Sequence, residues 1–320
     1  MSRNTVIILV VVLLVIVIPA LIATAIGVAM LLSRNTSAFS FGGNEVALIR
    51  VEGVISSDRG SSGFFGGSSA GAERIIDILE SFRKDKGVKA AVIRINSPGG
   101  SAAGSQEIYQ EIQKVRRDGK KITVSMGDVA ASGGYYIASA ADRILADQAT
   151  MTGSIGVIMH ASDMHELYNK IGIRFDTIKT GPYKDIGSNS RSMTPAEKQL
   201  LQNLVNDVFE QFIADVSAGR KLPLADVRKI ADGRIFTGRQ AMKLKLVDRI
   251  GSLQDALDAA AKDSGIKGEY EVVEYDREKG FWDILMAGAD SSLSGWVRDS
   301  GLLSQVAQRM LTGAGGLRMR

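Results

Sequence analysis

The sequence predicts an α/β fold with a largely parallel sheet, and two features of the chain lead to that prediction. Short apolar runs rich in β-branched residues alternate with segments of helical periodicity, as expected where crossover helices connect parallel strands. Two glycine-rich turns each follow such a run and open a helical segment. With 320 residues, of which 45% are apolar and 23% charged, the chain can build a sizeable core.

The first segment predicts a membrane anchor. Residues 5–32 carry no charge and are almost all apolar, whereas about 20 residues suffice to cross a bilayer. A cleavable signal has an apolar stretch of only about 7–15 residues, so we expect residues 1–34 to hold a short cytoplasmic tip and an uncleaved transmembrane helix. A signal peptide that is removed is the alternative. Arg3 and Arg34 flank the run and decide its orientation only weakly; we favour a cytoplasmic N-terminus with the rest of the chain outside.

The remaining chain divides into a linker, one domain and a tail. Residues 35–44 are rich in Ser and Gly, which is typical of a linker, and residues 45–279 carry the α/β pattern. Within the domain, residues 60–71 are rich in Gly and Ser and predict a mobile loop, in which Phe64 and Phe65 would pack locally. The tail, residues 280–320, is expected to be poorly ordered unless it docks.

Within the domain, each regular element is predicted from its periodicity and its flanking residues. A proline at the first helical position and an early glutamate mark the start of one long helix at Thr194. We expect strands at residues 45–54, 88–95, 121–126, 154–159, 173–180 and 270–275. We expect helices at residues 73–84, 102–117, 132–141, 164–171, 194–218, 224–231, 238–244 and 253–263.

Composition excludes several classes of function. The net charge of +4 is spread along the chain without a basic stripe interleaved with aromatic residues, so we expect no nucleic-acid partner. The chain has no cysteine, which removes disulfides, thiolate metal sites and a cysteine nucleophile. The only histidines, His160 and His165, do not have the spacing of the His-Glu-x-x-His zinc motif. We therefore expect neither a metal nor a cofactor.

The first glycine-rich turn, at residues 96–101, reads Asn-Ser-Pro-Gly-Gly-Ser. Gly99 and Gly100 can leave backbone amides exposed at the start of the next helix, where they and the helix dipole suit a developing negative charge. An oxyanion hole is the functional interpretation of this turn. A plain strand-to-helix turn is the structural one, and the residues of the turn leave both open.

The second glycine-rich turn places Ser132 at the start of a helical segment, in the run Ala-Ala-Ser-Gly-Gly-Tyr-Tyr at residues 130–136. Small neighbours would let a substrate backbone approach, and a helix N-terminus lowers the cost of negative charge on a serine oxygen. Ser132 is therefore a candidate nucleophile, although this run taken alone favours a simple N-cap.

A serine nucleophile needs a base, and the sequence offers two kinds. His160 and His165 lie about the start of a helix, where a histidine commonly caps the helix or faces solvent. Lys184 lies in a loop after an expected strand, and a lysine can act as the base when its surroundings favour the neutral amine. We expect the neighbouring Asp185 to point away from it, but a solvated loop lysine would look the same in sequence.

As a set, these motifs resemble the signal peptide peptidase A family of serine proteases. The matching motifs are Ser-Pro-Gly-Gly, Ala-Ser-Gly-Gly-Tyr-Tyr, Thr-Gly-Ser-Ile-Gly-Val at residues 152–157, and Tyr-Lys-Asp at residues 183–185. The similarity covers about residues 45–275 together with the N-terminal anchor. It implies the ClpP/crotonase-type superfold of repeated β–β–α and β–α units and a short, membrane-anchored chain with one catalytic unit.

The resemblance also implies roles for particular residues. Ser132 matches the family's nucleophile, Lys184 matches the general base, and Ser154 matches the serine that orients the lysine amine. The residues assigned to the oxyanion hole are Gly99, Gly100 and Gly133. Family members of this kind imply a homo-oligomeric ring in which serine and lysine meet across a subunit boundary, at the surface of a lipid bilayer.

The implied activity is hydrolysis of remnant signal peptides or other unfolded apolar peptides by a membrane protein whose catalytic domain lies outside the cytoplasm. Three alternatives stay open from sequence alone. The chain could trim one specific membrane protein, as the stomatin-associated relatives do, or carry out acyl-CoA chemistry on a crotonase-like fold. It could also be a non-enzymatic scaffold for a membrane partner.

Overall fold

The computed structural model describes residues 44–60 and 69–275. The expected anchor at residues 1–34, nearly all of the linker, the segment 61–68 with Phe64 and Phe65, the last residues of the expected domain from 276 and the tail at residues 280–320 lie outside the described residues. Among the helices of the two described ranges, none combines the length and the apolar character that a bilayer crossing requires.

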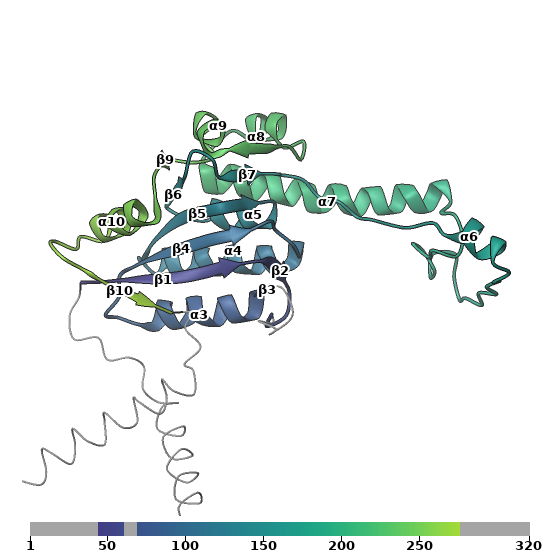
Figure 1. Cartoon of the computed structure of the whole chain (residues 1–320), viewed down its shortest axis with the longest axis horizontal. Helices are drawn as coiled ribbons and strands as arrows, with labels where there is room; N and C mark the ends of the chain where they lie inside the picture. The colour runs from purple at the N-terminus through teal and green to yellow at the C-terminus, as the bar shows by residue number, and fades with distance from the viewer. Residues whose placement is uncertain (1–43, 61–68, 276–320) are drawn as a thin grey trace, which may run out of the picture. The chain divides into compact units, whose positions relative to one another are not determined.

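An eight-stranded sheet forms the centre of the domain (Figure 1). Its main path runs in the order β10-β1-β4-β5-β6-β9 with every neighbouring pair parallel, while β7 pairs in parallel with the far end of β5 and antiparallel with β8. The strands are β1 (Glu45–Glu52), β4 (Ala90–Ser97), β5 (Lys121–Ala131), β6 (Arg143–Ala146), β7 (Met151–Gly153), β8 (Ile235–Thr237), β9 (Arg249–Ile250) and β10 (Glu271–Glu274).

Helices cover both faces of the sheet, which confirms the predicted α/β class. The helices α3 (Ala72–Lys84), α4 (Ala102–Arg117) and α5 (Gly133–Ser139) lie on one face and α10 (Leu253–Asp263) on the other (Figure 1). Strand β4 is apolar along most of its length because alternate residues enter two separate cores. Ile93 packs in the core under α3 and α4, and Val92 packs in the core under α10.

A small second sheet lies next to the first glycine-rich turn. Its strands, β2 (Val54–Ser56) and β3 (Ser69–Gly71), pair in parallel. Ile55 of β2 forms a further parallel bridge with Gly100, through which β2 flanks the turn that follows β4. The end of the expected loop at residues 60–71 is therefore a strand.

The long helix α7 (Pro195–Arg220) carries the most exposed part of the domain. It starts as predicted, with a capping box between Thr194 and Glu197. Its C-terminal half packs on the core through Phe212, Ile213 and Val216, whereas its N-terminal half runs out from the sheet toward α6 (His165–Lys170) (Figure 1). We call residues 158–204 the arm. The helices α8 (Leu224–Ile230) and α9 (Gly238–Lys243) follow α7.

Two predicted strands are wrong, and both lie in or beside the arm. Residues 154–159 have no regular structure, because strand β7 ends at Gly153, and residues 173–180 form no strand either. Ile173, Phe175 and Ile178 are exposed, so within the described ranges the apolar pattern that predicted a strand is not buried in a core, although Phe175 packs on Tyr168 of α6. The predicted helices at residues 102–117 and 253–263 match α4 and α10 at both ends.

Candidate active site

Ser132 lies at a strained turn between β5 and α5. Its backbone has φ 51° and ψ −120°, a conformation that costs a residue with a side chain about 1–3 kcal/mol. Two hydrogen bonds hold it there: the Ser132 N–H donates to the Gly153 carbonyl at 2.8 Å, and the Tyr136 N–H donates to the Ser132 carbonyl at 2.8 Å. Strain kept in place by neighbours on both sides is a feature of reactive residues at strand-to-helix turns.

The candidate residues around Ser132 come from the carboxyl ends of three neighbouring strands. In the register of the sheet, Ser97 of β4 is paired with Ala130, and Gly153 of β7 is paired with Ala131. The turn after β4, the serine after β5 and the serine after β7 therefore meet at one edge of the sheet. This is the edge at which parallel α/β sheets usually bind ligands.

Gly99 touches Ser132 so closely that no side chain fits there. A Cβ atom on Gly99 would lie 2.7 Å from the Gly133 nitrogen and 2.8 Å from the Ser132 Cβ, and its φ of +101° also favours glycine. The Gly99 N–H itself donates to the Ser97 Oγ at 3.1 Å. Gly99 thus lets the two turns come into contact, and its own amide is already bonded inside the turn.

Two other amides are placed to receive negative charge beside Ser132. The bridge between β2 and the turn uses the Ile55 N–H, which donates to the Gly99 carbonyl, and the Ser101 N–H, which donates to the Ile55 carbonyl. The Gly100 N–H therefore faces away from β2. Its nitrogen would lie 3.3 Å from a Cβ on Gly133. The Gly133 N–H belongs to the first residue of α5, where a helix leaves its amides free for a ligand.

We expect Gly99→Ala to lower peptidase activity by at least about 10²-fold, because the added methyl group would push the turn that carries the Gly100 amide away from Ser132 and Gly133. The matched control is Gly119→Ala. Gly119 has a similar φ of +89° but no atom within 4 Å of its added Cβ, so it tests backbone strain without the clash. Steady-state cleavage rates of both variants check the prediction, and an unimpaired Gly99→Ala enzyme would contradict it.

Ser154 lies beside Ser132 at the end of the adjacent strand. Because Ala131 and Gly153 are register partners, the two serines are neighbours across the sheet, about 5 Å apart along the pairing direction. Ser154 also has a positive φ of 51°, and its N–H donates to the Arg234 carbonyl at 2.8 Å. The Ser154 hydroxyl is therefore placed to form a hydrogen bond with a group that approaches Ser132 from the side of β7.

Lys184 lies on the arm and does not meet Ser132 within one chain. The neighbouring Asp185 is joined through Arg191 to Glu197 in the first turn of α7. Contacts with α5, the helix that follows the nucleophile, come from the C-terminal half of α7, for example from Phe212, whose ring centroid is 4.6 Å from that of Tyr136. Glu197 and Phe212 are 15 positions apart in α7, which corresponds to about 22 Å along a helix. Lys184 is exposed in this chain.

The histidines do not form a base for Ser132 either. His160 is exposed, and the His165 Nδ1 is 2.7 Å from the Asp163 Oδ1 at the start of α6. This hydrogen bond raises the pKa of His165 and favours the protonated ring. His165 is thus tied to its own segment of the arm.

Two buried serines that sequence reasoning did not select shape the site. Ser97 accepts the Gly99 amide, and the Oγ of Ser105 lies where a Cβ on Gly133 would come within 2.3 Å. Both are fully buried. Ser97 opens the Ser-Pro-Gly-Gly motif, so the motif itself was the available signal. Ser105 is an ordinary helical serine in sequence and could be found only from the structure.

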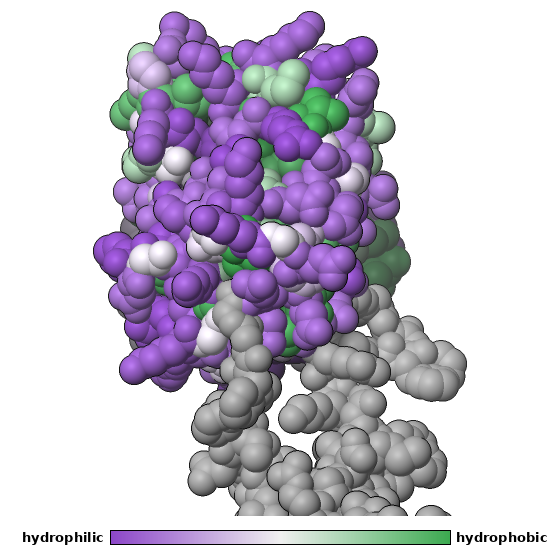
Figure 2. All heavy atoms as spheres, turned by 90° about the vertical axis from the view of Figure 1, so that its left-hand side faces the viewer, coloured by the Kyte–Doolittle hydropathy of each residue, from purple (hydrophilic) through white to green (hydrophobic). Residues whose placement is uncertain are grey.

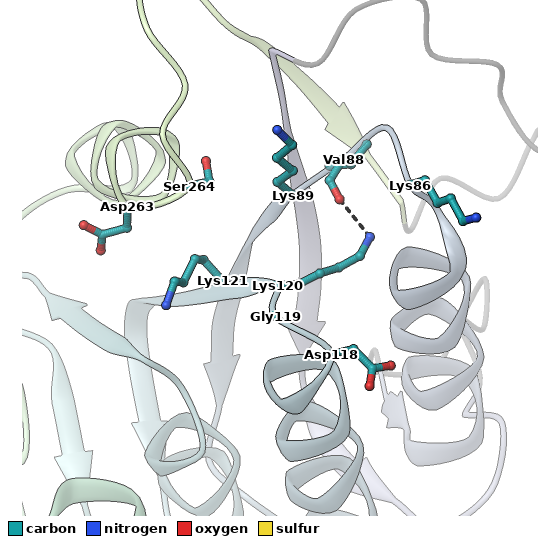
Figure 3. Close-up of a pocket in the computed structure, with 9 residues that line it drawn as sticks. All are labelled: Lys86, Val88, Lys89, Asp118, Gly119, Lys120, Lys121, Asp263 and Ser264. Carbon is teal, nitrogen blue, oxygen red and sulfur yellow. Dashed lines mark hydrogen bonds between the residues drawn. The ribbon is translucent and has the colours of Figure 1, made fainter.

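A separate hollow lies at the opposite edge, where β4 and β5 begin. Its volume is about 310 Å³, and Lys86, Lys89, Lys120 and Lys121 line much of it (Figure 3). The lysine side chains point in different directions, and the Lys120 amine donates to the Val88 carbonyl at 2.7 Å (Figure 3). The surrounding face is largely hydrophilic (Figure 2). The charged side chains that line this hollow do not converge on one point, and the hollow provides no apolar groove for a peptide.

Comparison with known proteins is consistent with this geometry. The family model described as peptidase family S49 matches residues 114–267, which include Ser132, Ser154 and Lys184. A Synechocystis sp. protein provisionally named as a protease is 40% identical over 233 residues, which cover 72% of this chain and 79% of the relative. An Enterococcus faecium protein, provisionally named signal peptide peptidase SppA, is 35% identical over 73% of this chain and 67% of its own length.

Among solved structures, a point mutant of ClpP1 from Listeria monocytogenes matches with a TM-score of 0.43 at 14% identity, covering 66% of this chain and 94% of that one. The family itself follows from the sequence relatives, which the chain matches over most of their length. The chain belongs to peptidase family S49 and is a serine peptidase.

Proposed function

We propose that this serine peptidase is a membrane-bound endopeptidase that cleaves remnant signal peptides and other unfolded apolar peptides, with Ser132 as nucleophile and Lys184 as general base. The observation that carries the proposal is the strained Ser132 turn, which lies beside the free amides of Gly100 and Gly133. A serine oxygen with two amides next to it suits acyl transfer, in which negative charge develops on the substrate oxygen.

Each residue then has a step in the reaction. The neutral amine of Lys184 takes the proton of the Ser132 hydroxyl while Oγ forms a bond to the substrate carbonyl carbon. The Gly100 and Gly133 amides stabilise the resulting oxyanion. The lysine ammonium then protonates the leaving amine as the peptide C–N bond breaks. Water, deprotonated by the same lysine, releases the acyl group from Ser132.

The proposal requires Lys184 to come from a neighbouring copy of the chain in a ring. The arm that carries Lys184 is rich in exposed apolar side chains, which monomeric proteins rarely gather on one surface. Those on the arm include Ile158, Met159, Leu167, Ile171, Phe175 and Ile178. A second copy would cover them and could bring Lys184 to the Ser132 edge, with Ser154 placed to hold the amine.

The substrate and the location are inferred from smaller signals. Ala131, Gly99 and Gly133 leave little bulk around Ser132, which suits a small side chain next to the scissile bond. The name of the Enterococcus faecium relative and the uncharged run at residues 5–32 support a peptide substrate at a membrane. The orientation with the catalytic domain outside the cytoplasm is part of the proposal.

The test uses the full chain in lipid vesicles with three substrates: a synthetic apolar signal-peptide remnant, a folded soluble protein and an acyl-CoA thioester. We expect cleavage of the remnant alone, and none by a Ser132→Ala control. Thioester hydrolysis without peptide cleavage would instead favour acyl-CoA chemistry. If the remnant stays intact while one co-reconstituted membrane protein is trimmed, the enzyme has a specific partner and the proposed clearance role is wrong.

A further inference from the structure

The strongest ionic network of the arm lies next to the proposed general base. The carboxylate of Asp185, the residue directly after Lys184, accepts hydrogen bonds from Arg191 at 2.9 and 2.7 Å and from Lys179 at 2.6 Å. Its side chain is only 13% exposed, although the arm around it is open. The Asp185 carboxylate thus pairs with two cations, Arg191 and Lys179.

Arg191 also connects this loop to the start of α7. Its guanidinium bonds both oxygens of Glu197, at 2.9 and 2.5 Å, and Glu197 in turn accepts the Thr194 N–H at 2.8 Å. The Glu197 side chain is 2% exposed. This network has a mechanical role, because a guanidinium that bonds two carboxylates at once fixes the loop on a rigid helix.

The position of Asp185 gives the network a second consequence. A general base must lose its proton, and an uncompensated carboxylate next to an amine stabilises the protonated ammonium. Hydrogen bonds from Arg191, and next from Lys179, hold the pKa of Asp185 well below its usual value. Asp185 is therefore charged throughout the pH range in which the enzyme would work, and its charge has to be cancelled by its partners.

We propose that Arg191 is a positioning residue for the base, which fixes the Lys184 loop on α7 and screens Lys184 from the charge of Asp185. The inference rests on the proposed function, because it takes Lys184 as the base. Lys179 supports the same role from the other side of the carboxylate.

Several other charged groups near the two halves of the site are also paired. Glu197 keeps the bonds from Thr194, and Asp163, just before α6, pairs with His165. At the nucleophile edge, Asp232 pairs with Arg234, whose carbonyl accepts the Ser154 amide. Removing Arg191 would leave Asp185 with Lys179 alone and Glu197 with its bonds from Thr194 alone, so removal of the Asp185 charge in a second variant shows which carboxylate acts on Lys184.

The test is the pH dependence of kcat/KM for cleavage of the apolar peptide by the full chain in vesicles. For Arg191→Gln we expect the rising limb of the profile to move about one unit toward alkaline pH, with about a tenfold loss at neutral pH and recovery at high pH. Adding Asp185→Asn to this variant should return the limb to its wild-type position, because the uncovered charge is gone. Asp185→Asn alone leaves Arg191 and Lys179 without this carboxylate, and it should move the limb toward acidic pH.

A purely mechanical role would give a different result. Arg191→Gln would then lower kcat/KM equally at every pH, and the double variant would be no better than the single one; either finding overturns the proposal. If Arg191→Gln does not fold, the same test can use Lys179→Gln. This variant should show a smaller alkaline shift of the rising limb, and adding Asp185→Asn should cancel that shift. An unshifted Lys179→Gln profile would then overturn the proposal.

The failure of this inference can be told apart from failure of the proposed function. If Lys184→Ala is inactive but Arg191→Gln shows no shift, only the role of Arg191 is wrong. If Lys184→Ala keeps wild-type activity, Lys184 is not the base, and the proposed mechanism and the role of Arg191 fall together.

Discussion

Replacing Ser132 by alanine is expected to reduce peptide cleavage by at least about 10³-fold and to leave the fold unchanged. Alanine keeps the Cβ atom and removes only the oxygen that would bond to the substrate carbonyl. The backbone bonds to Gly153 and from Tyr136 do not involve the side chain, so the turn should persist. Rate measurements on the full chain, with circular dichroism as a check on folding, test this expectation.

Ser132→Gly is the matched control for this prediction. Both variants lack the nucleophile and should be inactive, but glycine adopts φ 51° without the steric cost that a Cβ carries. The glycine variant should therefore be more stable than the alanine variant by about 1 kcal/mol in thermal unfolding. Equal stability would mean that the turn is not strained. Cleavage by either variant would remove Ser132 from its proposed role.

Replacing Lys184 should have an effect of the same size, and arginine should not substitute for it. Lys184→Ala removes the base, and Lys184→Arg supplies a guanidinium that stays protonated at every accessible pH, so both should lose about 10³-fold in kcat. The wild-type rate should rise from neutral to alkaline pH as the base loses its proton.

The control for Lys184 is Lys170→Ala, since Lys170 is another exposed lysine of the arm, at the end of α6. We expect it to match the wild type at every pH. Substantial activity in Lys184→Arg would show that a fixed positive charge suffices and that Lys184 is not a general base.

Much of the nucleophile's side of the site could be predicted from sequence, because its residues lie where regular elements begin and end. Gly99 and Ser132 each follow a predicted strand, and parallel strands bring their carboxyl ends to one edge. Ser154 was assigned only through the family resemblance, because it was predicted to begin a strand and instead follows β7. The glycines could be assigned because consecutive glycines after a strand indicate a place where the backbone is closely approached. The strain at Ser132 could not, because the same Ser-Gly-Gly run would also begin an ordinary helix with a normal N-cap.

The arm was the part that sequence patterns misjudged. Ile173 and Ile178 predict a buried strand only on the assumption that apolar residues find partners in their own chain, and here they are exposed. Short strands such as β9, of two residues, carry too little periodicity to be recognised. Arg191 was not selected at all, since its role depends on Asp185 and Glu197, each six residues away on a folded loop.

The central claim is that the nucleophile and the base of one site belong to different copies of the chain, and mixing two inactive variants tests it most directly. Full-length Ser132→Ala and Lys184→Ala chains, each with its own affinity tag, are co-expressed, and the mixed assemblies are purified through both tags. In randomly mixed rings, about one quarter of the neighbouring pairs have an intact Ser132 on the first copy and an intact Lys184 on the second. Sites shared between copies would therefore restore about one quarter of the wild-type activity per chain. Mixed assemblies that contain both chains and remain as inactive as either variant alone would contradict the account.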